Sequence, residues 1–353
     1  MKRSLKQATL KLLKNSGVFG FVRDSAWRRN RLLILCYHGI SLADEHLWRP
    51  GLYLEPSRLE QRLDLMRQGG YNVLPLCEAL QMLRAHELPP RSVSITFDDG
   101  AYDFFKLAHP LLKKFQFPVT VYQTTYYSER QVPVFNLVCS YLLWKRRGSL
   151  LDKGAELGLK PPLDLTTEAK RHAIVEALLD HCAKGDLDAI QKNEVAHALA
   201  KLLEIDYAEI LSQRILQLMN PQEIAQLARD GVDFQLHTHR HRVPKNKFLF
   251  QKELRDNRER LSQAAHGERV HFCYPSGVHS PELLPWLAEA NVISATTCDV
   301  GLAEADTNPL LLPRMIDTTA RTTVEFEGWL TGVSDFLAMN RKASGHYPPR
   351  TDQ

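Results

Sequence analysis

Short apolar runs alternate with amphipathic segments over the first third of the chain, from residue 31 to residue 125. Four runs have the length and apolar composition of buried strands, at 31–37, 71–76, 92–97 and 118–125. The segments between them have apolar residues at helical spacing, at 55–70, 77–88 and 101–117. This regular strand–helix order predicts an α/β fold with a mostly parallel sheet, either open or closed into a barrel.

The strand–helix order stops after Tyr127 and returns at Asn220. Residues 128–218 lack strand signals and are rich in Leu, Ala, Lys and Glu, which predicts a helical insertion. Asn220 and Glu223 then have the spacing of a capping box at the start of a helix, and an apolar strand follows at 232–237. We therefore expect one α/β domain that is interrupted by a helical block.

The basic residues are concentrated at the N-terminus. Residues 1–31 contain nine Lys or Arg and one acid, Asp24, which leaves the remaining chain with 36 basic and 40 acidic residues. Together with its interleaved apolar side chains, this segment suits a basic amphipathic helix on an anionic membrane surface. A surface helix packed on the domain, with its charges in water, is the alternative. The main body has neither a basic face nor a phosphate-binding loop, so we expect no nucleic-acid partner.

Composition places the chain among ordinary globular proteins, with 44% hydrophobic and 24% charged residues. No apolar run approaches the length of about 20 residues that a membrane-spanning helix needs. Lys11 and Lys14 interrupt any signal-peptide core, and the six cysteines form no CxxC pair. These features predict a cytoplasmic protein with reduced thiols, peripheral on the inner face of the membrane if the N-terminal segment binds there.

Two clusters of metal-binding residue types end two of the predicted strands. Asp98 and Asp99 follow the strand at 92–97, and three histidines occur within residues 237–241. Adjacent carboxylates repel each other unless a cation or a shared proton lies between them. Because the carboxyl ends of parallel strands share one edge of a sheet, a carboxylate and two imidazoles can meet there and leave positions open for water and substrate. The histidine cluster taken alone is also compatible with a solvated loop.

The sequence TFDDG at 96–100 and HTHRH at 237–241 resemble the first two motifs of the polysaccharide deacetylases of carbohydrate esterase family 4, the NodB-homology domain. The resemblance covers roughly residues 32–125 and 218–320. It implies a distorted (β/α) barrel of about seven mostly parallel strands. It also implies that Asp99, His237 and His241 bind one divalent ion, with zinc preferred over nickel, cobalt or manganese, and that Asp98 is the catalytic base.

The third family motif is matched imperfectly by FCYPSG at 272–277, where Ser276 stands at a position that is commonly aromatic. The resemblance implies that a backbone N–H near Ser276 stabilises the oxyanion. Tyr274 could shape the sugar pocket, although an aromatic residue beside a turn more often packs in the core.

The late Leu-x-His motif that supplies the catalytic acid in many family members is absent after Arg314. A strand ending in Tyr-His is similar to a branch that includes the biofilm poly-N-acetylglucosamine deacetylases, which implies His38 as the acid. A partly buried histidine that caps a strand is the alternative for His38. Arg314 could orient Asp98, or it could be a surface arginine at a strand edge, and Asp317 could equally be its partner.

The implied function is the metal-dependent removal of acetyl groups from N-acetylated amino sugars of a polysaccharide or a lipid-linked glycan. The alternatives are an O-deacetylase or small-amide hydrolase on the same metal site, and a non-catalytic carbohydrate-binding relative. The expected organisation is a basic N-terminal helix at 1–31, a catalytic domain at 32–330 with the insertion at 128–218, and a C-terminal tail at 331–353.

Overall fold

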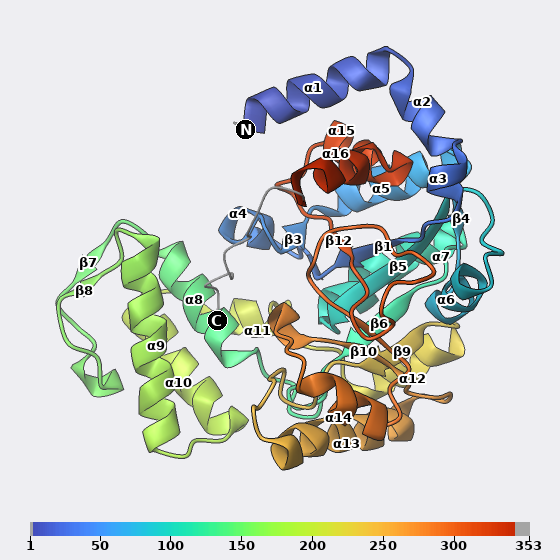
Figure 1. Ribbon diagram of the computed structural model, residues 1–353. Coiled ribbons are helices and arrows are strands. Elements are labelled where there is room, and N and C mark those ends of the chain that lie inside the picture. Colours follow the sequence, from blue (N-terminus) through green and yellow to red (C-terminus); the bar gives the residue numbers. More distant parts are fainter. Residues whose placement is uncertain (1–2, 343–353) are drawn as a thin grey trace.

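A parallel sheet forms the centre of the computed structural model, which describes residues 3–342 (Figure 1). Seven strands follow the order β11-β10-β9-β6-β5-β1-β12, and an eighth, β4, pairs with the start of β5. Every pairing in this sheet is parallel. The strands are β1 (Leu33–Tyr37), β4 (Asn72–Val73), β5 (Ser92–Asp99), β6 (Thr120–Gln123), β9 (Asp233–Leu236), β10 (His271–Cys273), β11 (Ser294–Thr296) and β12 (Met315–Ile316).

The two ends of this strand order are joined by the segment just before β12. The N–H of Leu312 donates to the carbonyl of Ala295 at 2.9 Å, and the N–H of Thr297 donates to the carbonyl of Leu312 at 2.9 Å. β12 itself pairs with β1 on its other side. The sheet therefore curls into a distorted (β/α) barrel, which confirms the fold expected from the sequence.

Helices cover the outside of the sheet and bury its apolar face in one large core. Asn220 and Glu223 form the predicted capping box at the start of α12. The expected strand at 71–76 is short, because Pro75 has no N–H to donate to a ladder and instead precedes the first turn of α6. The helices on the outside of the sheet are α5 (Pro56–Gln68), α6 (Leu76–Arg84), α7 (His109–Phe115), α12 (Pro221–Arg229), α13 (Lys247–Ala264) and α14 (Leu283–Glu289), with a π-helical turn η1 (Phe104–Ala108) before α7.

Residues 128–218 form a lobe beside the barrel, drawn in green and yellow-green in Figure 1, with its own apolar core. Its elements are mainly helical: α8 (Phe135–Lys145), η2 (Ala155–Leu157), α9 (Glu168–Lys184), α10 (Ala189–Leu202) and α11 (Tyr207–Ser212). A short antiparallel pair, β7 (Leu150–Leu151) and β8 (Leu163–Asp164), also lies there and was not expected from the sequence.

The lobe packs on the segment that follows β1. This segment comprises β2 (Gly39–Ile40), α4 (Glu45–Trp48) and β3 (Tyr53–Leu54), and Trp48 belongs to the apolar core of the lobe. Asp44 accepts a hydrogen bond from the Tyr141 hydroxyl and forms a 2.6 Å ion pair with Lys145, both on α8. Because β2 begins directly after His38, the lobe contacts the carboxyl end of the barrel.

The N-terminal segment folds as three short helices, α1 (Arg3–Asn15), α2 (Val18–Arg23) and α3 (Ala26–Arg29). They lie against α15 (Thr323–Thr331) and α16 (Val333–Lys342), and a small apolar cluster forms where Leu10 and Phe19 meet Val324 and Val333. The expected C-terminal tail therefore begins with a helix, and residues 343–353 lie outside the described part. Within residues 3–342, no helix has the combination of length and hydropathy that a membrane span requires.

Candidate metal centre and active site

Parallel register brings the two sequence clusters together at the carboxyl edge of the barrel. Asp99 pairs with Gln123 of β6, and Gln123 pairs in turn with Leu236 of β9. His237 is the next residue after Leu236, so it reaches the level of Asp99. Asp99 and His241 both have a left-handed backbone, with φ of 70° and 53°. Left-handed backbone at non-glycine residues is unfavourable and is often found where a site must aim its side chains.

Asp99, His237 and His241 form a compact three-ligand group. The Oδ1 atom of Asp99 lies 3.2 Å from the Nε2 atom of His237 and 3.2 Å from the Nε2 atom of His241. Two ligands of a tetrahedral ion are about 3.4 Å apart when each lies about 2.1 Å from the metal. The observed spacing therefore fits a divalent ion between these three side chains.

The hydrogen bonds of His237 support the same conclusion. Its Nδ1 atom lies 2.8 Å from the carbonyl oxygen of Cys273, which can only accept, so Nδ1 has the proton. In a neutral imidazole, Nε2 then has a lone pair that faces the Asp99 carboxylate. Two acceptors at this distance require either a second ring proton or a cation between them. Such a carbonyl–histidine contact is also the usual outer contact of a metal-binding histidine.

Electrostatics keep Asp99 ionised. Burial alone would raise the pKa of Asp99, but the His241 and His237 rings, when protonated, hold it well below its usual range through their charge and hydrogen bonds. The anionic carboxylate is the form that binds a metal. His239 is not part of this group, because its Nδ1 atom pairs with the Thr125 hydroxyl at 2.8 Å.

Asp98 lies beside the ligand group and is paired with a buried arginine. The Arg314 guanidinium contacts both carboxylate oxygens of Asp98, at 2.7 and 2.8 Å, and its Nε atom donates to the carbonyl of Thr297. Arg314 has no solvent exposure. Asp317 pairs with Arg62 instead, at 3.0 Å. The sequence left Asp98 and Asp317 open as partners of Arg314, and in the structure Arg314 pairs with Asp98.

The pKa of Asp98 is lowered overall. Burial would raise it, but the Arg314 charge and hydrogen bonds outweigh that effect. Asp98 is thus an ionised carboxylate with a fixed orientation.

His38 is near Asp98, at the end of β1. The Nε2 atom of His38 lies 3.8 Å from the Oδ2 atom of Asp98. Burial lowers the pKa of His38, and the charge of Asp98 only partly opposes this. The two residues named from the sequence as acid and base are therefore adjacent.

Ser276 and Tyr274 have different surroundings. Ser276 is exposed in the turn η3 (Pro275–Gly277) and has a left-handed backbone, with φ of 55°. The Tyr274 side chain is fully buried in the core, where its hydroxyl donates to the carbonyl of Leu310 at 3.0 Å. Tyr274 therefore has no surface to offer a sugar, which corresponds to the packing alternative.

Two cysteines next to Asp98 were not identified as site residues from the sequence. The Sγ atoms of Cys36 and Cys273 lie 3.5 and 3.4 Å from the Oδ2 atom of Asp98. Burial raises the pKa of both thiols, so they remain protonated donors. Their strand positions give one signal, since β1 and β10 both end at the carboxyl edge of the barrel, where Asp98 lies.

Helix α13 holds the histidine loop through two buried polar residues, Glu253 and Asn257. The Asn257 side chain accepts from the N–H of His237 at 3.0 Å and donates to the carbonyl of Gln123. Glu253 accepts from the N–H of Arg240 at 2.8 Å. Polar residues one helical turn apart on the apolar face of α13 were the available sequence signal.

Comparison with known proteins identifies a protein family that part of the chain matches. The model of the family described as polysaccharide deacetylase matches residues 185–317 of the chain, a range that includes the candidate ligands His237 and His241 and also Arg314. Residues 185–317 match a polysaccharide deacetylase domain. The matched range leaves out Asp98 and Asp99, which the fold brings to the same edge.

The chain also has curated and structural relatives. It is 26% identical over 96 residues to the poly-beta-1,6-N-acetyl-D-glucosamine N-deacetylase of Escherichia coli K12, a match that spans 27% of this chain and 14% of that protein. The PplD deacetylase of Streptococcus pyogenes, solved with acetate, superimposes with a TM-score of 0.55 and 20% identity, covering 86% of this chain and 97% of that one. IcaB from Ammonifex degensii gives a TM-score of 0.53 and 16% identity, covering 85% and 97%. At these identities the two structures establish the fold of the domain.

Proposed function

We propose that the protein is a metal-dependent hydrolase that removes acetyl groups from N-acetylated amino sugars of a polysaccharide or a lipid-linked glycan. The observation that supports this most strongly is the facing pair of acceptors, His237 Nε2 and Asp99 Oδ1, with the ionised Asp98 directly beside them. The curated E. coli relative is named for N-deacetylation of such a polymer. A binding relative without catalysis would not need the base together with the ligands.

Asp99, His237 and His241 would hold the ion, with zinc first among the candidates. When bound, a divalent ion supplies Lewis acidity, which polarises an acetyl carbonyl and makes water nucleophilic near neutral pH. An outer contact supports one of these ligands, because the carbonyl of Cys273 orients His237.

The remaining steps belong to the protein's own side chains. Asp98 accepts a proton from the attacking water, whose oxygen bonds to the acetyl carbon. His38 gives a proton to the departing amine nitrogen as the carbon–nitrogen bond breaks, and acetate and a free amine result. The 3.8 Å between the Nε2 atom of His38 and the Oδ2 atom of Asp98 is longer than a hydrogen bond, so the two side chains must move closer before the proton taken from water can pass to His38 and restore it. An N–H of the turn at Ser276 is our candidate for stabilising the oxyanion.

Arg314 has a positioning role in this scheme. It fixes the orientation of the Asp98 carboxylate and neutralises the charge of that carboxylate. The guanidinium thus takes the place of the water that would otherwise solvate the buried charge. Arg314 makes Asp98 a weak base. A weak base is sufficient here, because a bound divalent ion would make the attacking water more acidic.

The compartment is part of this proposal. None of the six cysteines forms a disulfide, as is usual for proteins of reducing compartments, so we place the activity in the cytoplasm. A lipid carrier at the inner face of the membrane is then a source of acetylated sugar.

The test combines activity with metal content. The purified protein is incubated with β-1,6-linked N-acetylglucosamine oligomers and with O-acetylated glycans, and mass spectrometry measures the loss of acetyl groups. We expect loss from the N-acetylated oligomers, inhibition by a chelator and recovery with zinc. Loss from the O-acetylated glycans alone would favour the O-deacetylase alternative.

Variants separate the roles. His237→Ala is expected to lose bound metal, whereas His239→Gln in the same loop is the matched control and is expected to keep it. Asp98→Asn is expected to retain metal while turnover falls by orders of magnitude. Full activity after chelation, or full metal content in His237→Ala, would contradict the proposal.

A further inference from the structure

We propose that helices α1 and α2 bind the protein peripherally to an anionic membrane surface. The argument uses the N-terminal surface alone, so it does not depend on the proposed deacetylation. It starts from apolar side chains that the fold leaves in water.

Among the described residues, Phe21 and Leu12 are the most exposed large hydrophobic side chains, at 80% and 70%, and Leu5 on the same segment is 56% exposed. Leu5 and Leu12 are seven positions apart, which places them on one face of α1. Leu10 and Phe19 are buried against α15 and α16. A helix that only packs on its domain needs one apolar face, whereas this segment has a covered face and an uncovered one.

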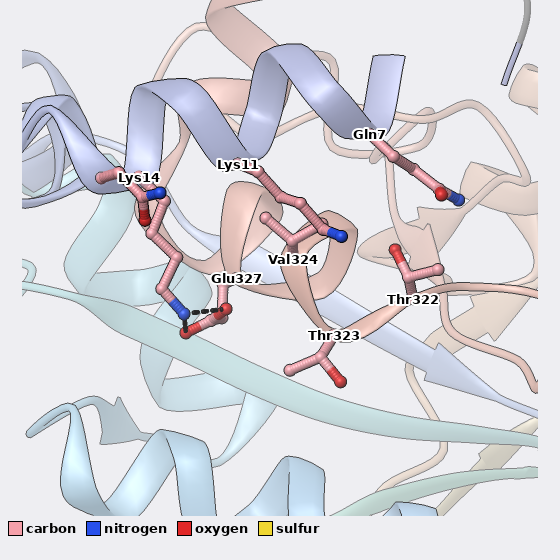
Figure 2. Close-up of a pocket in the computed structure, with 8 residues that line it drawn as sticks. Gln7, Lys11, Lys14, Thr322, Thr323, Val324 and Glu327 are labelled. Atoms are coloured by element: carbon pink, nitrogen blue, oxygen red, sulfur yellow. Dashed lines mark hydrogen bonds and ion pairs between the residues drawn. The ribbon is translucent and has the colours of Figure 1, made fainter. Parts of the chain in front are cut away.

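Charge on the same segment favours an anionic partner. Nine basic residues and one acid lie within residues 1–31. Carboxylates elsewhere in the chain neutralise only some of them: Lys14 pairs with Glu327 at 2.6 Å, Arg31 with Glu304 at 2.9 Å and Lys6 with Glu325 at 3.7 Å. Figure 2 shows the groove between α1 and α15, where Lys14 meets Glu327 while Lys11 extends beside Val324. In the described part of the chain, no carboxylate lies within 4 Å of the Lys11 ammonium.

The size and composition of this surface favour a membrane over a second protein. Three separated apolar side chains can bury only a few hundred Å², while a stable protein interface buries about 800 Å² on each partner. Leu and Phe beside lysines are the typical side chains of a helix that lies in the lipid interface. Basic residues near an anionic leaflet then add a salt-dependent attraction.

The position of α1 is compatible with a catalytic role at the membrane. In Figure 1, α1 runs along the top of the molecule, and its first turn lies towards the side of α4 and β3. These two elements follow His38 at the carboxyl edge of the barrel. If α1 lies on a membrane, the carboxyl edge of the barrel is therefore at the side of the molecule and not on the face opposite the membrane.

The experiment is co-sedimentation of the full chain with two kinds of vesicle, phosphatidylcholine alone and phosphatidylcholine with phosphatidylglycerol. We expect binding to the anionic vesicles only, with at least a tenfold loss of affinity between 50 and about 300 mM salt. Leu12→Ser with Phe21→Ser is expected to weaken binding at least tenfold. Deletion of residues 1–31 is a poor test, because it removes buried side chains that stabilise the fold.

Matched controls use equally exposed side chains elsewhere. Leu150→Ser with Phe248→Ser changes a Leu at 64% and a Phe at 68% exposure, and is expected to leave vesicle binding unchanged. Lys11→Glu is expected to weaken binding to anionic vesicles further at low salt. No binding at low salt, or equal binding by Leu12→Ser with Phe21→Ser, would overturn the proposal. A dimer in analytical ultracentrifugation that this double variant dissolves, without vesicle binding, would also overturn it and assign the surface to a second copy.

Discussion

Replacing Arg314 with methionine is expected to destabilise the protein and abolish activity together. Methionine is apolar and of similar length, so it fills much of the same space. It leaves the Asp98 carboxylate buried without the guanidinium that contacts both of its oxygens. Removal of one partner of a buried ion pair typically costs about 3–5 kcal/mol.

The size of the effect on the melting temperature follows from chain length. At about 2.1 cal/mol/K per residue, unfolding of 353 residues has an entropy of about 0.74 kcal/mol/K. A loss of about 3–5 kcal/mol then lowers Tm by about 4–7 °C. Arg62→Met is the matched control, because Arg62 also forms a fully buried ion pair, with Asp317, outside the metal group. It is expected to lower Tm similarly and to keep turnover at temperatures where it is folded.

The pH dependence gives a second readout. In the native protein the pKa of Asp98 is lowered, so its ionised form stabilises the fold at every pH above the unfolded value of about 3.9, and this contribution is lost as pH falls through the folded pKa. Without Arg314, burial dominates and raises the pKa of Asp98, so the variant loses stability above pH 4. The Tm difference between the native protein and Arg314→Met is therefore expected to narrow as pH falls from 7 to about 4.5.

Differential scanning calorimetry, with turnover measured in parallel, checks both readouts. Asp98→Asn with Arg314→Met removes both charges and is expected to recover part of the lost Tm and to show no such narrowing. A Tm drop below about 1 °C in Arg314→Met, or a difference that does not depend on pH, would refute the reasoning.

Three further predictions concern other parts of the site. His38→Gln is expected to reduce turnover about 10²–10⁴-fold while metal content stays unchanged, which turnover assays and metal analysis measure together. Asn257→Leu is expected to weaken metal affinity about 10–100-fold in a chelator competition, because the loop that bears His237 loses its support, whereas Glu259→Gln on the exposed side of α13 is expected to have no effect. Asp44→Ala is expected to speed hydrogen exchange in α8 with a Tm change of less than about 2 °C, since it removes a contact between the lobe and the barrel but leaves the core of each intact.

The barrel was predictable because its signals are local. Strand and helix patterns occupy contiguous stretches, and TFDDG and HTHRH each end a strand, so parallel pairing alone brings Asp99 close to His237. The capping box at Asn220 fixed the start of α12 for the same reason. Short strands were harder to place, as β4 shows, since two residues give almost no periodicity.

The partner of Arg314 could not be predicted, because it depends on register between distant strands. Asp98 and Asp317 are both plausible carboxylates in sequence, and only the pairing of β12 with β1 decides which one the guanidinium reaches. The contacts of Cys36 and Cys273 with Asp98 could not be predicted either. A lone buried cysteine usually behaves as a small apolar residue, so its sequence position does not indicate a polar contact. Asn257 had a weak signal, as a polar residue in line with Phe250, Leu254 and Leu261 on α13.

The late position of Arg314 has a consequence for biosynthesis. Asp98 and Arg314 are 216 positions apart, and the strand that brings them together is the last of the barrel. A nascent chain therefore contains Asp98 and the open edge of β1 well before Arg314 and β12, their partners, have been synthesised. Both contacts join residues that are far apart in sequence. Products of premature termination before residue 314 would lack both the closing strand and the guanidinium, so they would present an unpaired strand edge to chaperones and proteases. The segment that contains Arg314 thus completes both the edge of β1 and the contacts of Asp98.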